Sequence, residues 1–175
     1  MHLKNGNISI RKFIRSDIEK KIDWINNPKN NTYLHYDIPL IYENTVAWYE
    51  RIKDVDTRFD AVIEYNGEPV GLIGLLGIDS TNRKAEYYIC LGEENYKGKG
   101  IATIASKLLI EYAFEEQNLN KIYLYTEEEN IGAQRLFEKL GFKQEGHLKH
   151  DLIFKGRIVN RYIYSLLKEE YNKSI

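Results

Sequence analysis

The sequence has few of the features on which secreted and membrane proteins depend. Cys90 is the only cysteine among 175 residues, so no disulfide can form within the chain, and this suits a reducing compartment. No apolar run approaches the roughly 20 residues that a membrane-spanning helix needs. The first residues also lack the apolar segment of a signal peptide. We therefore expect a cytoplasmic protein that has no membrane partner.

Clustered metal ligands and an excess of positive charge are also missing. The histidines His147 and His150 are three positions apart in an expected strand, where their side chains point to opposite faces. We therefore predict no metal site. The formal net charge is −1, and the aromatic residues are not interleaved with basic ones. Both observations argue against a nucleic-acid partner.

The composition indicates an ordinary folded domain. Hydrophobic residues make up 43% of the chain, which is enough for a real core, and charged residues make up 29%. The sequence contains no internal repeat, no low-complexity stretch and no linker rich in glycine and serine. Residues 1–175 are therefore expected to form a single domain.

Hydrophobic periodicity predicts a mixed order of strands and helices. The turn Asn66-Gly67 lies between two apolar runs and is the strongest short signal of a hairpin. Strands are expected over 8–13, 59–65, 69–78, 85–91, 121–125, from 142 onward and over 157–167, and helices over 16–27, 42–55, 101–112 and 131–140. This order predicts an α/β (α+β) fold, with a mixed, largely antiparallel sheet of about seven strands and helices on both faces.

The segment Asn95-Tyr96-Lys97-Gly98-Lys99-Gly100-Ile101-Ala102 lies between a buried strand and a long helix. The start of a helix leaves N–H groups unpaired and carries partial positive charge. Glycines at 98 and 100 allow these groups to approach an anion closely. The pattern therefore favours a phosphate or diphosphate site, and a flexible loop is the alternative. It matches neither a Walker loop nor a dinucleotide fingerprint.

Two segments together resemble the GNAT superfamily of N-acetyltransferases. The glycine turn is similar to that family's acetyl-CoA-binding signature, Gln/Arg-x-x-Gly-x-Gly/Ala. A second segment, residues 129–146, contains Glu-Lys-Leu-Gly-Phe followed by Glu-Gly. This ending is typical of the branch that holds ribosomal-protein N-terminal acetyltransferases and spermidine N-acetyltransferases. The resemblance extends from the first strand to about Leu167, and it implies the GNAT fold.

The resemblance implies acetyl-CoA as the acetyl donor. The backbone of the glycine turn would hold its diphosphate, and the end of the preceding strand would pair with its pantetheine arm. Asn95 stands where relatives hold Gln or Arg. Asn130 matches an asparagine that binds the pantetheine arm, although asparagine also caps helices. The cofactor residues expected in this way are Cys90, Leu91, Asn95, Lys97, Gly98, Lys99, Gly100, Ile101, Ala102 and Asn130.

Catalysis requires a proton acceptor, because an alkyl amine with a pKa near ~10 is an ammonium at neutral pH. Relatives place a glutamate at the position of Glu86, which is our candidate base. A solvated residue or a salt bridge is the alternative role. Many relatives use a tyrosine in the last helix as the acid, but this chain has Phe137 there. Tyr125 is the nearest other phenol, and water is the alternative. Cys90 is interpreted as a small buried hydrophobe.

The function predicted is transfer of acetyl to a primary amine. A polyamine, a protein N-terminus and an amino sugar nucleotide remain open as the acceptor. A catalytically weak acyl-CoA-binding sensor or assembly module is the alternative from another class. A homodimer is compatible with the resemblance, although nothing in the sequence fixes it. The residues expected near the acceptor, some of them core, are Trp24, Tyr33, His35, Tyr36 and Trp48. The run Glu127-Glu128-Glu129 is interpreted as a helix start, with attraction of a polyamine as the alternative.

Overall fold

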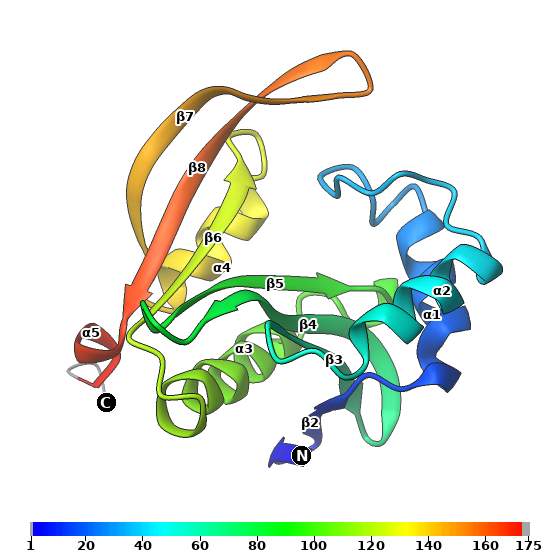
Figure 1. Ribbon diagram of the computed structural model, residues 1–175, viewed down its shortest axis with the longest axis horizontal. Coiled ribbons are helices and arrows are strands. Elements are labelled where there is room, and N and C mark those ends of the chain that lie inside the picture. Colours follow the sequence, from blue (N-terminus) through cyan, green and yellow to red (C-terminus); the bar gives the residue numbers. More distant parts are fainter. Residues whose placement is uncertain (1, 173–175) are drawn as a thin grey trace.

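The computed structural model describes residues 2–172, in which eight strands form one sheet (Figure 1). The strands are β1 (His2–Asn5), β2 (Ile8–Lys12), β3 (Arg58–Tyr65), β4 (Glu68–Asp79), β5 (Lys84–Leu91), β6 (Lys121–Glu127), β7 (Lys143–Phe154) and β8 (Arg157–Leu167). Their order across the sheet is β1-β2-β3-β4-β5-β6-β8-β7. Neighbouring strands are antiparallel except for β5 and β6, which are parallel. The expected mixed, largely antiparallel sheet is therefore confirmed.

The sequence analysis missed one strand and one short helix. β1 is a short and largely exposed edge strand with no apolar alternation to mark it. It forms a hairpin with β2 through Gly6, whose φ is 59°. The last helix, α5 (Lys168–Asn172), was also not expected. The turn at Asn66 and Gly67 has positive φ at both positions, 53° and 85°, as the hairpin signal predicted.

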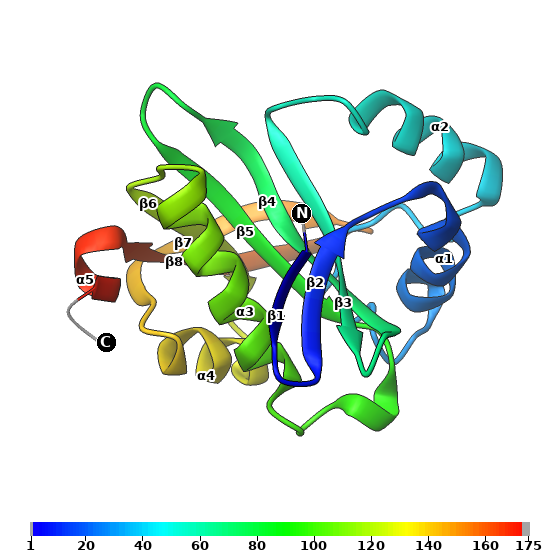
Figure 2. The ribbon, with the colours of Figure 1, turned by 90° about the horizontal axis from the view of Figure 1, so that it is seen from below.

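Helices cover both faces of the sheet (Figure 2). On one face, α1 (Ile18–Asn26) and α2 (Tyr42–Ile52) pack over side chains that include Val62 and Leu72. On the other face, α3 (Ile101–Glu111) and α4 (Ile131–Lys139) cover neighbours of these residues along the same strands, such as Ile63 and Ile73. The alternation of side chains along a strand sorts them between the two layers. None of the helices described is long and apolar enough to span a bilayer.

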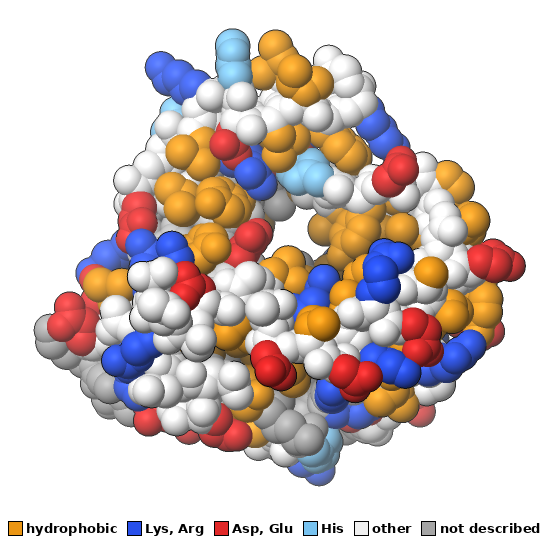
Figure 3. Space-filling view, viewed as in Figure 1, with side chains coloured by type: hydrophobic (Ala, Val, Ile, Leu, Met, Phe, Trp, Pro, Cys, Tyr) orange, Lys and Arg blue, Asp and Glu red, His pale blue; other side chains and the backbone are white. Residues whose placement is uncertain are grey.

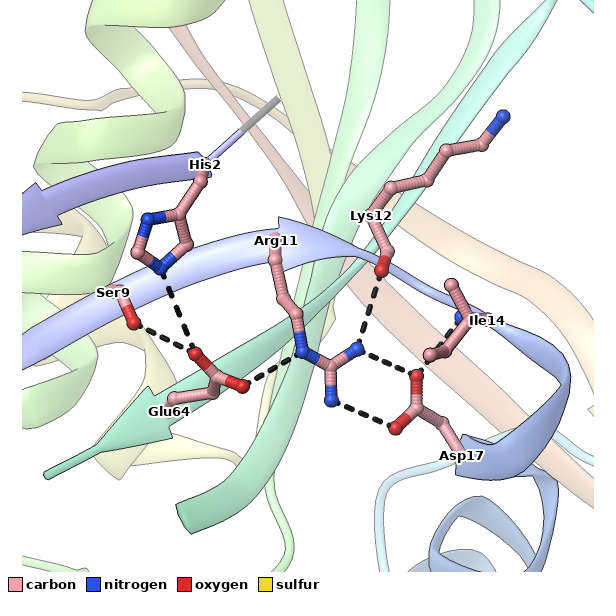
Figure 4. A network of polar contacts seen from close by, with 7 residues as sticks. All are labelled: His2, Ser9, Arg11, Lys12, Ile14, Asp17 and Glu64. Atoms are coloured by element: carbon pink, nitrogen blue, oxygen red, sulfur yellow. Dashed lines mark hydrogen bonds and ion pairs between the residues drawn. The ribbon is translucent and has the colours of Figure 1, made fainter. Parts of the chain in front are cut away.

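A partly buried network of charges fixes the start of α1 (Figure 4). The guanidinium of Arg11 donates to both carboxylate oxygens of Asp17, at 2.8 and 2.9 Å, and to Glu64 Oε1 at 2.7 Å. Asp17 Oδ2 also accepts the backbone N–H of Ile14, and Glu64 Oε2 accepts the hydroxyl of Ser9. These two carboxylates raise the pKa of Arg11 above its usual range even though burial opposes them. The network joins β2 and β3 to α1, so the position of α1 above the sheet is well defined.

The two parallel strands separate after a short stretch of pairing. Residues 84–86 of β5 pair with residues 121–123 of β6, and no further pairs join these two strands in the part of the chain described. β6, β8 and β7 then lean away from the rest of the sheet as an arm (Figure 1). The inner edges of β5 and β6 beyond this point face one another across a gap in the sheet, and the candidate site lies there.

Candidate active site

A cavity of about 470 Å³ lies where β5 and β6 separate. Its walls are formed by the end of β5, the end of β6, the first turn of α3, one side of α4 and part of the segment 29–35. Figure 3 shows the molecule hollowed near its centre, with hydrophobic side chains on the walls of the opening. Thr126 on β6 lines this cavity, and its Oγ1 is buried without a hydrogen-bond partner among the described residues. An unpaired buried hydroxyl is costly, which marks this wall as suited to a polar ligand.

Both glycines of the turn adopt a backbone conformation that favours glycine. Gly98 and Gly100 both have a φ of 75°, and Gly100 is the residue from which α3 begins. A Cβ at either position would meet no atom within 4 Å, so the requirement for glycine is conformational and not steric. The helix makes its first bond from Ile104 N to Gly100 O at 3.1 Å, which leaves the preceding N–H groups of α3 without a helical partner.

The structure brings only some of the predicted cofactor residues to this cavity. Those that line it are Cys90, Leu91, Lys97, Ala102 and Asn130. Lys97 is tied across the turn, because its Nζ donates to Asn30 Oδ1 at 2.9 Å.

The other predicted cofactor residues do not line the cavity. Asn95 is exposed in a short 3₁₀ turn, and Lys99 is exposed beside the ring of Tyr96. Gly98, Gly100 and Ile101 shape the turn behind the wall, and Ile101 is a core residue with 1% of its surface exposed.

Asn130 fulfils the cap role that was weighed as the alternative. Its Oδ1 accepts the N–H of Ala133 at 3.2 Å at the start of α4. The same side chain lines the cavity, and its amide nitrogen has no hydrogen-bond partner among the described residues. Asn130 is therefore able to cap the helix and to donate to a ligand.

Glu86 and Tyr125 lie where the first cavity meets a second one of about 450 Å³, and both residues line both cavities. Glu86 is the last residue of β5 that pairs with β6, so it stands where the strands begin to separate. Burial raises the pKa of the Glu86 carboxyl, and the charge of Arg161 opposes this shift. Neither Glu86 nor the hydroxyl of Tyr125 has a hydrogen-bond partner among residues 2–172. Glu86 was the candidate base and Tyr125 a candidate acid in the sequence analysis, and the structure brings both to the same junction.

Arg161 was not identified from the sequence, although it lines both cavities. Its guanidinium carbon lies 4.5 Å from the centre of the Tyr125 ring, and its Nε donates to Asp151 Oδ2 at 2.5 Å. An arginine over an aromatic face is attracted by the ring's electron density. Arg161 therefore fixes the ring of Tyr125 and places a positive charge near Glu86.

Cys90 and Phe137 do not supply reactive groups. Burial raises the pKa of the Cys90 thiol to about 11, although Lys21 and Lys97 oppose this, so the sulfur is protonated at neutral pH. A thiol in that state is a poor nucleophile. Phe137 is 6% exposed and packs edge-on against Tyr87 at a centroid distance of 6.1 Å.

The segment 27–41 contributes to the walls of both cavities and is held to the arm by a buried carboxylate. Glu127 accepts two hydrogen bonds from Arg157, at 2.8 and 2.9 Å, and lies 2.8 Å from His35 Nε2. Burial raises the pKa of Glu127, but the bonds from Arg157 and His35 outweigh it and hold the pKa below its usual value. Tyr33 donates to Glu129 O at 3.3 Å from the same segment. Glu127 therefore serves to close the site and is not free to attract a polycation.

The remaining residues expected near the acceptor divide between core and cavity. Trp24 is a core residue whose indole N–H donates to Glu93 at 2.9 Å. Tyr36 and Trp48 line the second cavity. His147 bonds to Glu128 at 2.8 Å, and no group of three or more metal-ligating side chains is found within the described chain.

Comparison with known proteins identifies the family. Residues 7–143 match the model of the acetyltransferase (GNAT) domain. The spermidine N(1)-acetyltransferase of Escherichia coli K12 is 39% identical over 110 residues, which cover 63% of this chain and 59% of that enzyme. The chain thus matches less than two thirds of that relative's length. The putative ribosomal N-acetyltransferase YdaF of Bacillus subtilis is 35% identical over 74% of this chain and 71% of its own length.

A solved structure matches over nearly the whole length. The crystal structure of spermidine N-acetyltransferase from Vibrio cholerae, in complex with CoA and spermine, has a TM-score of 0.88 and 26% identity. The match covers 96% of this chain and 99% of that one. Both the family and the fold expected from the two sequence motifs are therefore confirmed. The chain belongs to the GNAT acetyltransferase family.

Proposed function

We propose that this protein transfers an acetyl group from acetyl-CoA to a primary amine, and that Glu86 and Tyr125 perform the proton transfers. The observation that carries the proposal is the junction of two cavities at these residues. One cavity adjoins the glycine turn, and the other lies beneath α1, α2 and the segment 27–41. A donor and an acceptor that entered from the two sides would meet at Glu86.

The first cavity fits an acyl-CoA. Unpaired N–H groups at the start of α3 suit the diphosphate, as anions bind at helix N-termini. The facing edges of β5 and β6 offer backbone groups to an extended arm that contains amides. Thr126 and Asn130 have polar groups without protein partners on the same wall. When bound, acetyl-CoA would supply the acetyl group as a thioester.

Glu86 is suited to accept the proton that the acceptor must lose. A carboxylate whose pKa is raised by burial is a better base near neutral pH than an exposed one. In the reaction a bond forms between the amine nitrogen and the acetyl carbon, and the carbon–sulfur bond breaks. Glu86 takes the proton from nitrogen, and Tyr125 gives a proton to the departing sulfur. Arg161 keeps the ring of Tyr125 in place for this step.

The relatives suggest a polyamine as the first acceptor to test, because two of them are spermidine acetyltransferases by name. The protein N-terminus remains a second candidate, supported by the likeness to a putative ribosomal N-acetyltransferase. An amino sugar nucleotide is the third. A homodimer also stays a prediction, which sedimentation would test.

The test combines binding and turnover. Calorimetry should detect binding of CoA and of acetyl-CoA to the protein. Release of the free thiol of CoA from acetyl-CoA should depend on an added amine. Spermidine, a peptide with a free N-terminus and an amino sugar nucleotide would be compared. Absence of acetyl-CoA binding would contradict the proposal. Binding without transfer to any amine would instead favour the sensor or assembly module.

A further inference from the structure

We propose that the second cavity holds an anionic group of the acceptor at Lys21, so that the preferred acceptor is an amine that also carries a carboxylate or a phosphate. The inference rests on the proposed function and, among the acceptors left open there, favours an amine with an anionic group over a polyamine. Lys21 lines the second cavity and also a smaller one of about 250 Å³ beside α2.

Lys21 is a buried cation without an anionic partner. Its residue surface is 5% exposed, and no hydrogen bond or ion pair to its Nζ is formed within residues 2–172. The ammonium lies 4.4 Å from the ring centre of Trp48 and 5.1 Å from that of Tyr36. These rings attract the positive charge, but they offer no oxygen or nitrogen atom that could accept a hydrogen bond from its three N–H groups. A buried charge of this kind is normally paired, so the site lacks an anion.

The nearby protein groups do not supply that anion. Asp60 is the carboxylate whose charge acts on Lys21, but it already accepts two bonds from Arg58, at 2.6 and 2.8 Å, and one from Tyr88 at 2.7 Å. The thiol of Cys90 is protonated at neutral pH. The two groups whose charges favour the protonated form of Lys21 are therefore already engaged or neutral. Asp37 lines the smaller cavity together with Lys21, but it is exposed and forms no ion pair with Lys21 in the described chain.

The charges along the second cavity favour an amine with one positive group. Its cationic side chains are Lys21, Arg58 and Arg161, and its carboxylates are Asp60 and Glu86. With Asp60 bound by Arg58, Glu86 is the single carboxylate of this cavity that has no bonded partner in the described chain. A polycation needs several such carboxylates, whereas an acceptor with one amine and one anion can meet Glu86 and Lys21 together.

Burial lowers the pKa of the Lys21 ammonium to about 8. The side chain is therefore mostly protonated at pH 7, and an anion would hold it in that form. Binding of the anion should weaken as the pH rises above about 8, because the neutral amine no longer attracts it.

Paired acceptors that differ in one group test the inference. 4-Aminobutyrate is compared with 1,4-diaminobutane, which tests preference for a carboxylate. Glucosamine 6-phosphate is compared with glucosamine, which tests preference for a phosphate. We expect the wild type to favour the anionic member of at least one pair about 10-fold or more in kcat/KM. Lys21→Met should raise KM for that acceptor about 10- to 100-fold, as expected for loss of a charged hydrogen bond, and Lys21→Arg should retain part of the affinity.

The controls separate this inference from the proposed function. Lys21→Met should leave KM for acetyl-CoA unchanged, because Lys21 does not line the first cavity. Lys107→Met removes an exposed lysine of α3 and should not alter acceptor preference. The Lys21→Met variant should be at least as stable to heat as wild type, since an unpaired buried charge has been removed.

Two results would overturn the inference. One is a wild type that prefers 1,4-diaminobutane and glucosamine. The other is a Lys21→Met variant that keeps the wild-type preference. Calorimetric titration with glucosamine 6-phosphate and with 4-aminobutyrate tests the site without turnover, because wild type should bind at least one of them and Lys21→Met should bind neither. Failure of the wild type to bind both compounds would contradict the subsite even where acetyl-CoA binds.

Discussion

Replacing Glu86 with glutamine should separate catalysis from stability. The amide keeps the shape of the side chain but cannot accept the proton of an ammonium. General-base catalysis typically contributes about 10²- to 10⁴-fold, so kcat should fall within that range while KM for acetyl-CoA stays constant. Glu68→Gln, at an exposed position beside the β3–β4 turn, is the matched control and should retain full activity.

The pH dependence gives a second measure of the same residue. Burial raises the pKa of Glu86, so kcat of the wild type should decline as the pH falls through a value above the ordinary 4.5. Glu86→Gln should lose this step and keep only the dependence that comes from the acceptor's own ammonium. A variant within about 3-fold of wild type, with an unchanged acid limb, would refute the assignment of Glu86 as the base.

Stability provides the check on misfolding. Because the folded-state pKa of Glu86 is raised, its contribution to stability is present below the unfolded value and is lost as the pH rises through the folded value. At pH 7 the ionised carboxylate therefore opposes folding, and Glu86→Gln should melt at the same or a higher temperature than wild type. The difference should shrink toward pH 4. A less stable variant would show that the carboxylate has a structural role.

Five further substitutions test other parts of the structure. Tyr125→Phe should lower kcat about 10-fold or more through loss of the acid, whereas Tyr123→Phe, which removes the hydroxyl of the ring packed edge-on at 5.9 Å, should not. Gly100→Ala should lower the free energy of unfolding by about 1–2 kcal/mol and raise KM for acetyl-CoA, because φ is 75° there. Gly132→Ala, in α4 with open space around it, should instead raise the free energy of unfolding by about 0.5–1 kcal/mol. A denaturant titration measures both of these changes in stability. Gly92→Ala should destabilise by about 1–3 kcal/mol in calorimetry, because its Cβ would overlap the indole ring of Trp24. Wild-type stability of Gly92→Ala would show that the ring can move aside.

Local patterns in the sequence were sufficient to predict most of the fold. The hairpin at Asn66-Gly67 and the end of α4 at Gly141, where φ is 93°, follow from positions that need positive φ. The glycines at 98 and 100 indicated a close approach of the backbone to an anion, and the structure adds that both have positive φ. β1 could not, because a short polar edge strand has no periodic signal and depends on its pairing with β2.

The parts of the site that the sequence did not reveal depend on contacts between distant segments. Arg161 reaches Tyr125 from another strand, and Lys21 meets Trp48 from another helix. From the sequence alone, Lys21 cannot be distinguished from the other charged residues of an amphipathic helix. Its burial arises only when α2 and the segment 27–41 close over it. Thr126 likewise becomes an unpaired hydroxyl only because β5 and β6 separate beside it.

The geometry of β5 explains how one short strand can serve both cavities. Ala85 and Tyr87 point into the core, so the alternate residues Glu86 and Tyr88 point toward α1 and α2, where the acceptor would enter. Pairing with β6 ends at Glu86, so the gap that suits the donor opens beside the carboxylate that faces the acceptor. Arg58 and Arg161 are paired with Asp60 and Asp151, so Lys21 is the cation of the second cavity that would repel an additional ammonium of the acceptor and attract an anion. An acceptor anchored by its anion at Lys21 would therefore present its single amine to Glu86, and the same charges would select against a longer polyamine.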